Sequence, residues 1–157
     1  MSEASNRGGN LRWWWPAVAM MAIIFIWSTD LGASSHQSRF LLPFLRWLGL
    51  GAMAIDTTIG VIRKCGHLAE YAFLAILLWR AWMLRPALRP PIVWRWRDAL
   101  PPFLLCVGYA ALDEIHQAFV PSRVASVRDV MVDGGGAALG LALLWWWHRS
   151  RVAKAAS

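Results

Sequence analysis

Four long apolar runs dominate the hydrophobic pattern of the chain, and short polar or turn-forming segments separate them. The runs cover about residues 13–30, 65–84, 99–120 and 127–147. Each run is close to the roughly 20 residues that an α-helix needs to cross the hydrocarbon core of a bilayer. Within lipid, a helix also satisfies its own backbone hydrogen bonds. The pattern therefore predicts an all-α, polytopic integral membrane protein built as a four-helix transmembrane bundle.

The segment between the first and second runs has a different pattern. Apolar residues recur at helical spacing from Arg39 to Leu48, with Arg46 among them, which is typical of an amphipathic helix lying in the membrane interface. The stretch from Leu48 to Ile55 is uncharged but too short to span a bilayer. An amphipathic helix and a re-entrant segment therefore both stay open here. Three glycines are expected to loosen the chain after it: Gly49, Gly51 and Gly60.

Composition supports the membrane interpretation. Hydrophobic residues make up 58% of the chain and charged residues 16%, with a mean hydropathy of +0.42, which lies outside the usual balance of a soluble domain. The twelve tryptophans gather at the ends of the apolar runs, as in 13–15 and 145–147, where indoles settle at the headgroup level. The net charge of +7 comes from residues in several loops rather than from one basic stripe, so no nucleic-acid partner is expected.

Lysine and arginine are unevenly distributed between the segments that flank the runs. Ten lie in the N-terminal tail, the second loop and the C-terminal tail, and six lie in the first and third loops. Because basic residues are enriched in cytoplasmic segments, this predicts a multi-pass protein of the cell inner (plasma) membrane with both termini in the cytoplasm. The expected organisation is a tail over residues 1–12, a single transmembrane domain over 13–147 and a basic tail over 148–157.

The first apolar run has two interpretations. Basic residues, an apolar core and the small residues Gly32, Ala33 and Ser34 occur in the order of a cleavable signal peptide. However, the core is rich in tryptophan, which is typical of an anchor that stays in the membrane. We therefore favour an uncleaved first span, and whether it is cleaved stays open.

The third run ends in a group of polar side chains. An ionisable side chain at membrane depth costs roughly 2.5–3.5 kcal/mol on insertion scales and usually has a function. Tyr109, Asp113, His116 and Gln117 share one side of a helix, and Glu114 lies about 100° further round. An ordinary helix end with solvated charges is the alternative, but so many polar groups within five positions favour a face that is turned toward partner helices.

Two other runs carry polar residues that the predicted topology places at the same, outer membrane face. Lys64, His67, Glu70 and Tyr71 lie on one face of the second run. A single face of the fourth run carries two carboxylates and a small-xxx-small pair that permits close helix packing. These residues are Asp129, Asp133, Gly136 and Gly140. We therefore expect three helices to direct their ionisable residues into a common interior.

The order and spacing of these elements resemble those of the VanZ-like family of small membrane proteins. The elements are Lys64-x-x-His67, then Asp113-Glu114-x-x-Gln117 and an arginine, then an aspartate that opens the last helix, and they extend from about Trp27 to Gly140. Asp133 stands where the family often has asparagine. The resemblance implies a cell-envelope membrane protein, and the namesake of the family is associated with low-level resistance to the glycopeptide antibiotic teicoplanin. The resemblance implies no settled biochemical activity. We therefore treat antibiotic resistance as an association of the family and not as a function derived for this chain.

The polar residues suggest chemistry on, or binding of, a lipid-linked or phosphate-bearing envelope component. Whether the protein is an enzyme stays open. The candidate catalytic residues are His67, Glu70, Asp113, Glu114, His116 and Asp129. The candidate substrate-binding residues are Lys64, Tyr71, Gln117, Arg123, Arg128 and Asp133.

Two other functions compete with this hypothesis. The charges could form a non-catalytic ion-pair network that locks the helix ends or binds a lipid headgroup. Alternatively, the carboxylates could carry protons or ions in a small transporter, although carrier sites usually lie near the membrane midplane. His67, Glu70 and His116 with an aspartate would suit zinc, but the sequence has no His-Glu-x-x-His helix, so no metal or cofactor is expected. The sequence predicts the bilayer as a partner and leaves the substrate and oligomeric state open.

Overall fold

The computed structural model describes residues 12–29, 34–84, 94–121, 123 and 125–155, and these form helices and connecting turns, with no strand among them. The helices of this described part are α2 (Trp15–Ser28), α3 (Ser34–Trp47), α4 (Ala52–Met83), α5 (Trp96–Gln117) and α6 (Val127–Ala155). The all-α prediction is therefore confirmed for the described residues. Most of the N-terminal tail and of the second loop lies outside them.

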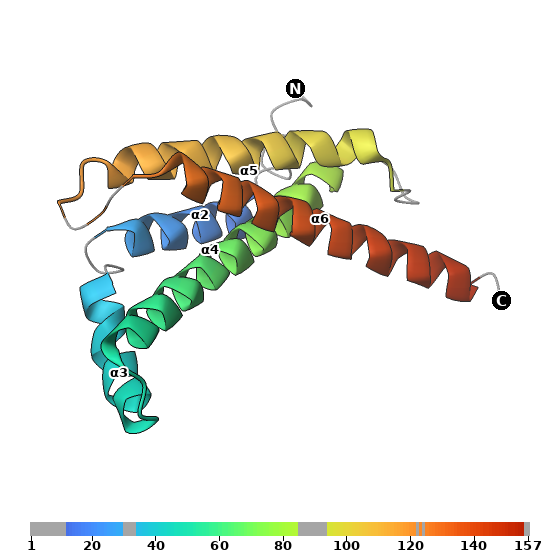
Figure 1. The fold of residues 1–157 in the computed structure, drawn as a ribbon. Helices are drawn as coiled ribbons and strands as arrows, with labels where there is room; N and C mark the ends of the chain where they lie inside the picture. Colours follow the sequence, from blue (N-terminus) through green and yellow to red (C-terminus); the bar gives the residue numbers. More distant parts are fainter. Residues whose placement is uncertain (1–11, 30–33, 85–93, 122, 124, 156–157) are drawn as a thin grey trace.

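Helices α4, α5 and α6 form the centre of the molecule (Figure 1). The most extensive contact joins α4 to α6, and α5 packs on both of these helices. Helix α2 packs against α4 and α5, while α3 contacts the N-terminal part of α4. The C-terminal part of α6 extends away from the other helices (Figure 1). The end of α5, the start of α6 and the end of α2 consequently lie at the same side of the molecule.

Helix α4 is longer than the sequence pattern predicts. It begins at Ala52 rather than near Cys65, and Gly60 lies inside it. One glycine costs a helix only about 1 kcal/mol, and here Ile55 and Ile59 offset that cost by packing against Leu45 of α3. The expected loosening occurs earlier, at the turn between α3 and α4. There Gly49 adopts a left-handed conformation with φ of +77°, which glycine reaches without a Cβ clash.

The segment predicted as amphipathic is a helix, α3, which continues past Pro43 to Trp47. Its described side chains include the buried Leu45 and the exposed Phe44 and Trp47, so one side faces α4. The helix is therefore confirmed, and its position in a membrane interface stays a prediction.

Small side chains allow α4 and α6 to approach closely. A Cβ atom on Gly136 would collide with the carbonyl oxygen of Leu68, and one on Gly140 with that of Ala72. Both obstacles are backbone atoms of α4, so they cannot rotate away. The small-xxx-small pair of the sequence therefore lies where α4 and α6 cross most closely.

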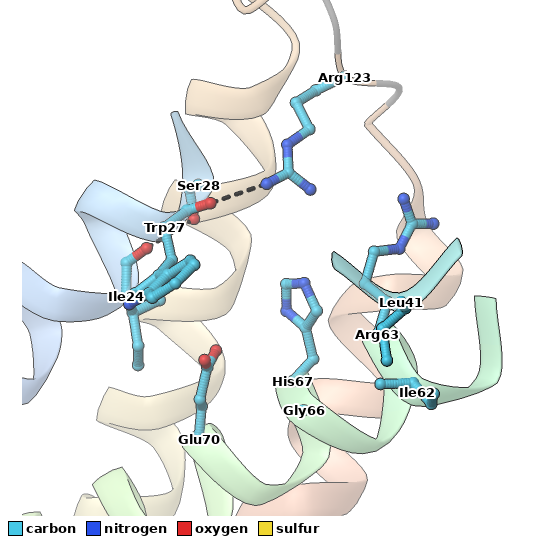
Figure 2. Close-up of a pocket in the computed structure, with 10 residues that line it drawn as sticks. All are labelled: Ile24, Trp27, Ser28, Leu41, Ile62, Arg63, Gly66, His67, Glu70 and Arg123. Atoms are coloured by element: carbon cyan, nitrogen blue, oxygen red, sulfur yellow. Dashed lines mark hydrogen bonds between the residues drawn. The ribbon is translucent and has the colours of Figure 1, made fainter. Parts of the chain in front are cut away.

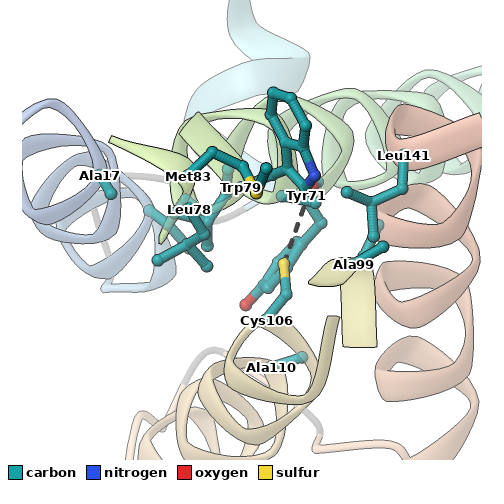
Figure 3. Packing of buried hydrophobic residues seen from close by; sticks show 13 residues of the cluster. Ala17, Tyr71, Leu78, Trp79, Met83, Ala99, Cys106, Ala110 and Leu141 are labelled. Carbon is teal, nitrogen blue, oxygen red and sulfur yellow. Dashed lines mark hydrogen bonds between the residues drawn. The ribbon is translucent and has the colours of Figure 1, made fainter. Parts of the chain in front are cut away.

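The buried core lies between the three central helices (Figure 3). Tyr71 is fully buried on α4, and the Cys106 thiol of α5 donates a hydrogen bond to its carbonyl oxygen over 3.5 Å. Ala110 and Leu141 complete the contact from α5 and α6. Tyr71 thus joins the apolar core to the polar end of the bundle.

One helix within the described residues, Val127–Lys154, is long and apolar enough to cross a membrane by length and composition. Helix α2 is apolar but has only 14 residues. Helix α4 is interrupted by charges on its way through the bundle, among them Arg63, Lys64 and Glu70. The four-span arrangement therefore stays a prediction, although the helices of all four predicted spans are present.

Candidate functional site

A pocket of about 280 Å³ lies between α2, α3, α4 and the segment after α5. Its polar lining consists of Arg63, His67, Glu70, Arg123 and Ser28. Figure 2 shows Glu70, His67 and Arg63 rising from α4 while Arg123 enters from the opposite side. The remaining walls are mainly apolar side chains of three helices: Ile24, Trp27, Leu41 and Ile62. The pocket therefore combines two guanidinium groups with a hydrocarbon surface.

Two contacts between ionisable side chains join α4 to α6, and one of them involves His67 of the pocket lining. The Lys64 ammonium group contacts the Asp129 carboxylate, with Nζ 2.5 Å from Oδ1. One turn further along both helices, His67 Nδ1 lies 3.6 Å from Asp133 Oδ1. The Lys64 side chain is half exposed, whereas Asp133 is fully buried. The two contacts thus form a short ladder that runs from the surface into the bundle.

The C-terminal turn of α5 supplies three buried polar side chains. Gln117 donates a hydrogen bond from Nε2 to Asp113 Oδ2 over 3.0 Å. Glu114 accepts a hydrogen bond over 2.7 Å from the backbone N–H of Ser126, just before α6. Asp113 lies within electrostatic range of His67 and Glu70. Glu114 therefore holds the turn into α6, while Asp113 adds a negative charge near His67 and Glu70.

Side chains of α5 and of the segment after it donate hydrogen bonds to backbone carbonyl oxygens of α2, and these bonds hold α2 beside the pocket. Arg123 donates from Nη2 to the carbonyl oxygen of Trp27 over 2.7 Å, and Tyr109 donates from its hydroxyl to that of Met21 over 2.6 Å. The His116 ring packs on Phe25 at a centroid distance of 4.4 Å. These contacts explain why residues of α2 line a pocket whose charged groups come from α4 and the α5–α6 segment.

The structure brings together most of the residues that the sequence singles out. Those on α4, α5 and α6 that meet at the same end are Lys64, His67, Glu70, Tyr71, Asp113, Glu114, Gln117, Asp129 and Asp133. Arg123 joins them in the pocket. His116 faces α2 through Phe25, and Arg128 is exposed on the first turn of α6. Of all the predicted residues, His67, Glu70 and Arg123 line the pocket itself.

Sequence reasoning missed the contribution of α2 and assigned no role to Arg63. Arg63 precedes Lys64 in the motif and turns into the pocket, where it faces Arg123 across the cavity (Figure 2). Ser28 is buried and donates its hydroxyl hydrogen bond to the Ile24 carbonyl oxygen. The signal was present at the end of the first apolar run, where Ser28 follows Trp27 and ends the hydrophobic pattern.

Several buried polar atoms at this end have no hydrogen-bond partner within the described part of the chain. They include His67 Nδ1, Tyr71 OH, Asp113 Oδ1 and both carboxylate oxygens of Asp133. An unpaired buried polar group costs about 1–3 kcal/mol, so such a concentration is typical of a site that is completed by a ligand or water. No three His, Cys, Asp or Glu residues in the described ranges are arranged to hold a metal ion.

A family model described as VanZ/LLP1 matches residues 13–148, which include α2 to α5 and most of α6. The chain belongs to the VanZ/LLP1 family. Comparison with curated proteins and with solved structures gives no match. Membership in VanZ/LLP1, together with the apolar helix α6, favours a membrane protein.

Proposed function

We propose that this VanZ/LLP1 protein is a multi-pass protein of the inner (plasma) membrane that binds the phosphate group of an envelope lipid in the pocket beside His67. The observation that carries the proposal is the lining of the pocket. Arg63 and Arg123 provide two positive charges against the single carboxylate of Glu70, and the other walls are largely apolar.

The two arginines suit a phosphate group. A guanidinium presents several donors in one plane and forms charge-assisted hydrogen bonds with phosphate oxygens. Arg63 comes from α4 and Arg123 from the segment after α5, so a phosphate between them would link two elements that are distant in sequence. The side chains that line the pocket carry two guanidinium groups and one carboxylate, and this balance favours an anion over a cation or a neutral headgroup.

The apolar walls suit the rest of a lipid molecule. Ile24 and Trp27 extend the pocket along α2, and Leu41 and Ile62 extend it along α3 and α4. Trp27 is half exposed, as expected of an indole that lies at the headgroup level. A ligand with a phosphate head and a hydrocarbon chain would contact the arginines with its head and the apolar side chains with its chain.

Binding is tested with the purified protein in nanodiscs of neutral phospholipid. Farnesyl phosphate and dioctanoyl phosphatidic acid are compared with farnesol and dioctanoylglycerol, which lack the phosphate, and affinity is measured by native mass spectrometry. Loss of a hydrogen bond to a charged group costs about 1.5–3 kcal/mol, so Arg63→Gln should weaken phosphate binding by about 10-fold or more. Arg97→Gln, which removes an exposed arginine at the opposite end of α5, is the matched control.

Equal binding of the phosphates and their alcohols would overturn the proposal. The same conclusion would follow if Arg97→Gln weakened binding as much as Arg63→Gln. Preference for the isoprenyl or the glycerol lipid identifies the source of the phosphate. If the association of the family with glycopeptide resistance depends on phosphate binding in this pocket, Arg63→Gln should alter glycopeptide susceptibility in cells.

The topology belongs to the same proposal: four spans, with both termini in the cytoplasm. It is supported by the charge distribution of the loops and by α6, which is long enough to span. Reporter fusions after Ser157 and within residues 34–38 should report opposite sides of the membrane. A report from the same side would contradict the four-span arrangement.

A non-catalytic lock is the competing function, and the α4–α6 ladder favours it. Lys64 with Asp129 and His67 with Asp133 join the helices directly. Removing one partner of a buried pair costs about 3–5 kcal/mol, whereas removing a ligand-binding group leaves the fold in place. Stability measurements on the variants described below separate the two functions.

A further inference from the structure

His67 is held so that its two ring nitrogens face different surroundings. Nδ1 is buried and lies 3.6 Å from Asp133 Oδ1. The residue also lines the pocket, and Figure 2 shows its ring standing between Glu70 and Arg63, below the Arg123 guanidinium. Since Nδ1 is turned to Asp133, Nε2 is the nitrogen that remains available to a molecule in the pocket.

Asp133 is suited to orient this imidazole. It is fully buried, and neither of its oxygens has a hydrogen-bond partner among the described residues. Burying a carboxylate without a partner is costly. The contact with His67 is longer than a good hydrogen bond, but such contacts commonly shorten when substrate binds. A carboxylate beside Nδ1 fixes the tautomer in which Nδ1 carries the proton and Nε2 is free to accept one.

We propose that His67, positioned by Asp133, is the general base for hydrolysis of a lipid phosphate monoester in this pocket; the inference rests on the proposed phosphate binding. His67 Nε2 removes a proton from water as the water oxygen forms a bond to phosphorus. The P–O bond to the lipid breaks, and the leaving oxygen takes a proton from the carboxyl group of Glu70. The products are the lipid alcohol and inorganic phosphate, and the proton on His67 then returns through solvent to Glu70.

The charges of the pocket match this reaction. The equatorial oxygens of a transferring phosphoryl group carry spread negative charge, and positioned arginines stabilise it. In Figure 2 the Arg123 guanidinium lies above the space between His67 and Glu70, and Arg63 lies on the other side of the His67 ring. Two guanidinium groups also balance the dianion of a phosphate monoester.

The test measures phosphate release from farnesyl phosphate and from dioctanoyl phosphatidic acid by the purified full-length protein in detergent. Wild type should release phosphate from at least one of them. General acid–base catalysis contributes roughly 10²–10⁴-fold, so His67→Gln should lower kcat by about 100-fold or more. Asp133→Asn should lower kcat with little change in KM, since it acts through the orientation of His67. His148→Gln and Asp56→Asn, at sites away from the pocket, are the matched controls and should retain the wild-type rate.

A pH profile adds a readout that a purely structural role would not change. Wild-type kcat should fall at low pH, because a protonated imidazole cannot accept a proton, and His67→Gln should remove that dependence. The charged groups that surround His67 are Asp133, Asp113, Asp129, Glu70, Arg63 and Arg123. Melting of each variant is measured in parallel. If Asp133→Asn is unstable, His67→Gln alone decides the proposal.

The outcomes separate this inference from the proposed function. Binding of lipid phosphates without any phosphate release overturns the hydrolysis and leaves phosphate binding standing. Absence of binding overturns both. Release that His67→Gln does not reduce assigns the chemistry to another group and also overturns the inference.

Discussion

The two ends of the bundle are built in opposite ways. At one end, rings from three parts of the chain pack on one another: Trp79 lies 5.2 Å from Trp94 and 5.3 Å from His148, and Trp96 lies 5.5 Å from Trp145. At the other end, charged side chains from α4, α5 and α6 surround a pocket. We refer to these as the aromatic end and the polar end.

The two ends differ in how completely their buried polar atoms are hydrogen-bonded. At the aromatic end, one buried polar atom, Trp94 Nε1, has no hydrogen-bond partner among the described residues. At the polar end, His67, Tyr71, Asp113 and Asp133 each leave at least one such atom. Proteins commonly give up stability where a site must receive a ligand. This difference supports the proposed binding site at the polar end.

The largest effect is expected where the two ends are joined, at the close crossing of α4 and α6. A side chain on Gly136 collides with the backbone of Leu68, so Gly136→Val should destabilise the protein by about 3 kcal/mol or more and should disturb both ends. Gly135 has open space beside it, so Gly135→Ala should change stability by no more than about 1 kcal/mol. Thermal melting in detergent measures both. Equal melting temperatures for the two variants would contradict the close crossing.

The next effect should be confined to the aromatic end. Trp79 is buried, and Trp79→Ala should cost about 3 kcal/mol through lost packing. The exposed Trp146 is the control, and Trp146→Ala should stay within about 0.5 kcal/mol. The folded fraction of Trp79→Ala should bind lipid phosphate with wild-type affinity. Weaker binding by that folded fraction would show that the ends are not independent.

A smaller change in stability is expected at the polar end, together with a large change in function. Asp113→Asn keeps an oxygen that can accept the hydrogen bond from Gln117 and removes the negative charge that acts on His67 and Glu70. Its melting temperature should fall by about 2–4 °C, as for a loss near 1 kcal/mol in a protein of this size. Glycopeptide susceptibility and lipid-phosphate binding should nevertheless change. Loss of function that follows loss of stability across Asp113→Asn, Glu114→Gln, His116→Gln and Arg123→Gln would favour the ion-pair lock.

The smallest effect is expected for the exposed rung of the α4–α6 ladder. Lys64 is half exposed, and exposed ion pairs contribute about 0–1 kcal/mol. Lys64→Gln should therefore melt within a few degrees of wild type. A loss of more than about 2 kcal/mol in the free energy of unfolding would indicate that these charged residues serve to join α4 to α6 and not to bind a ligand in the pocket.

Much of the helical pattern could be predicted from the sequence, because apolar periodicity and the ends of the runs depend on local chemistry. The spacing of Lys64 and His67 on one helix and of Asp129 and Asp133 on another predicted two faces that the structure does bring together. Gly136 likewise marked the face of closest approach.

Other features depended on tertiary contacts that no local pattern contains. The early start of α4 at Ala52 follows from packing on α3. The roles of Arg63 and Trp27 depend on α2 lying beside the polar end, where Arg123 bonds the Trp27 carbonyl oxygen. His116 could not be separated from Asp113 by spacing, since both lie on one side of α5 and only the position of Phe25 distinguishes them.

The most direct test of the account is a crystal structure grown in a lipidic mesophase with farnesyl phosphate. We expect the phosphorus atom in the pocket between the guanidinium groups of Arg63 and Arg123, next to His67, with the isoprenyl chain along Ile24 and Trp27. A pocket closed by an ion pair between Glu70 and either arginine, with the lipid bound elsewhere, would contradict the account and support the lock.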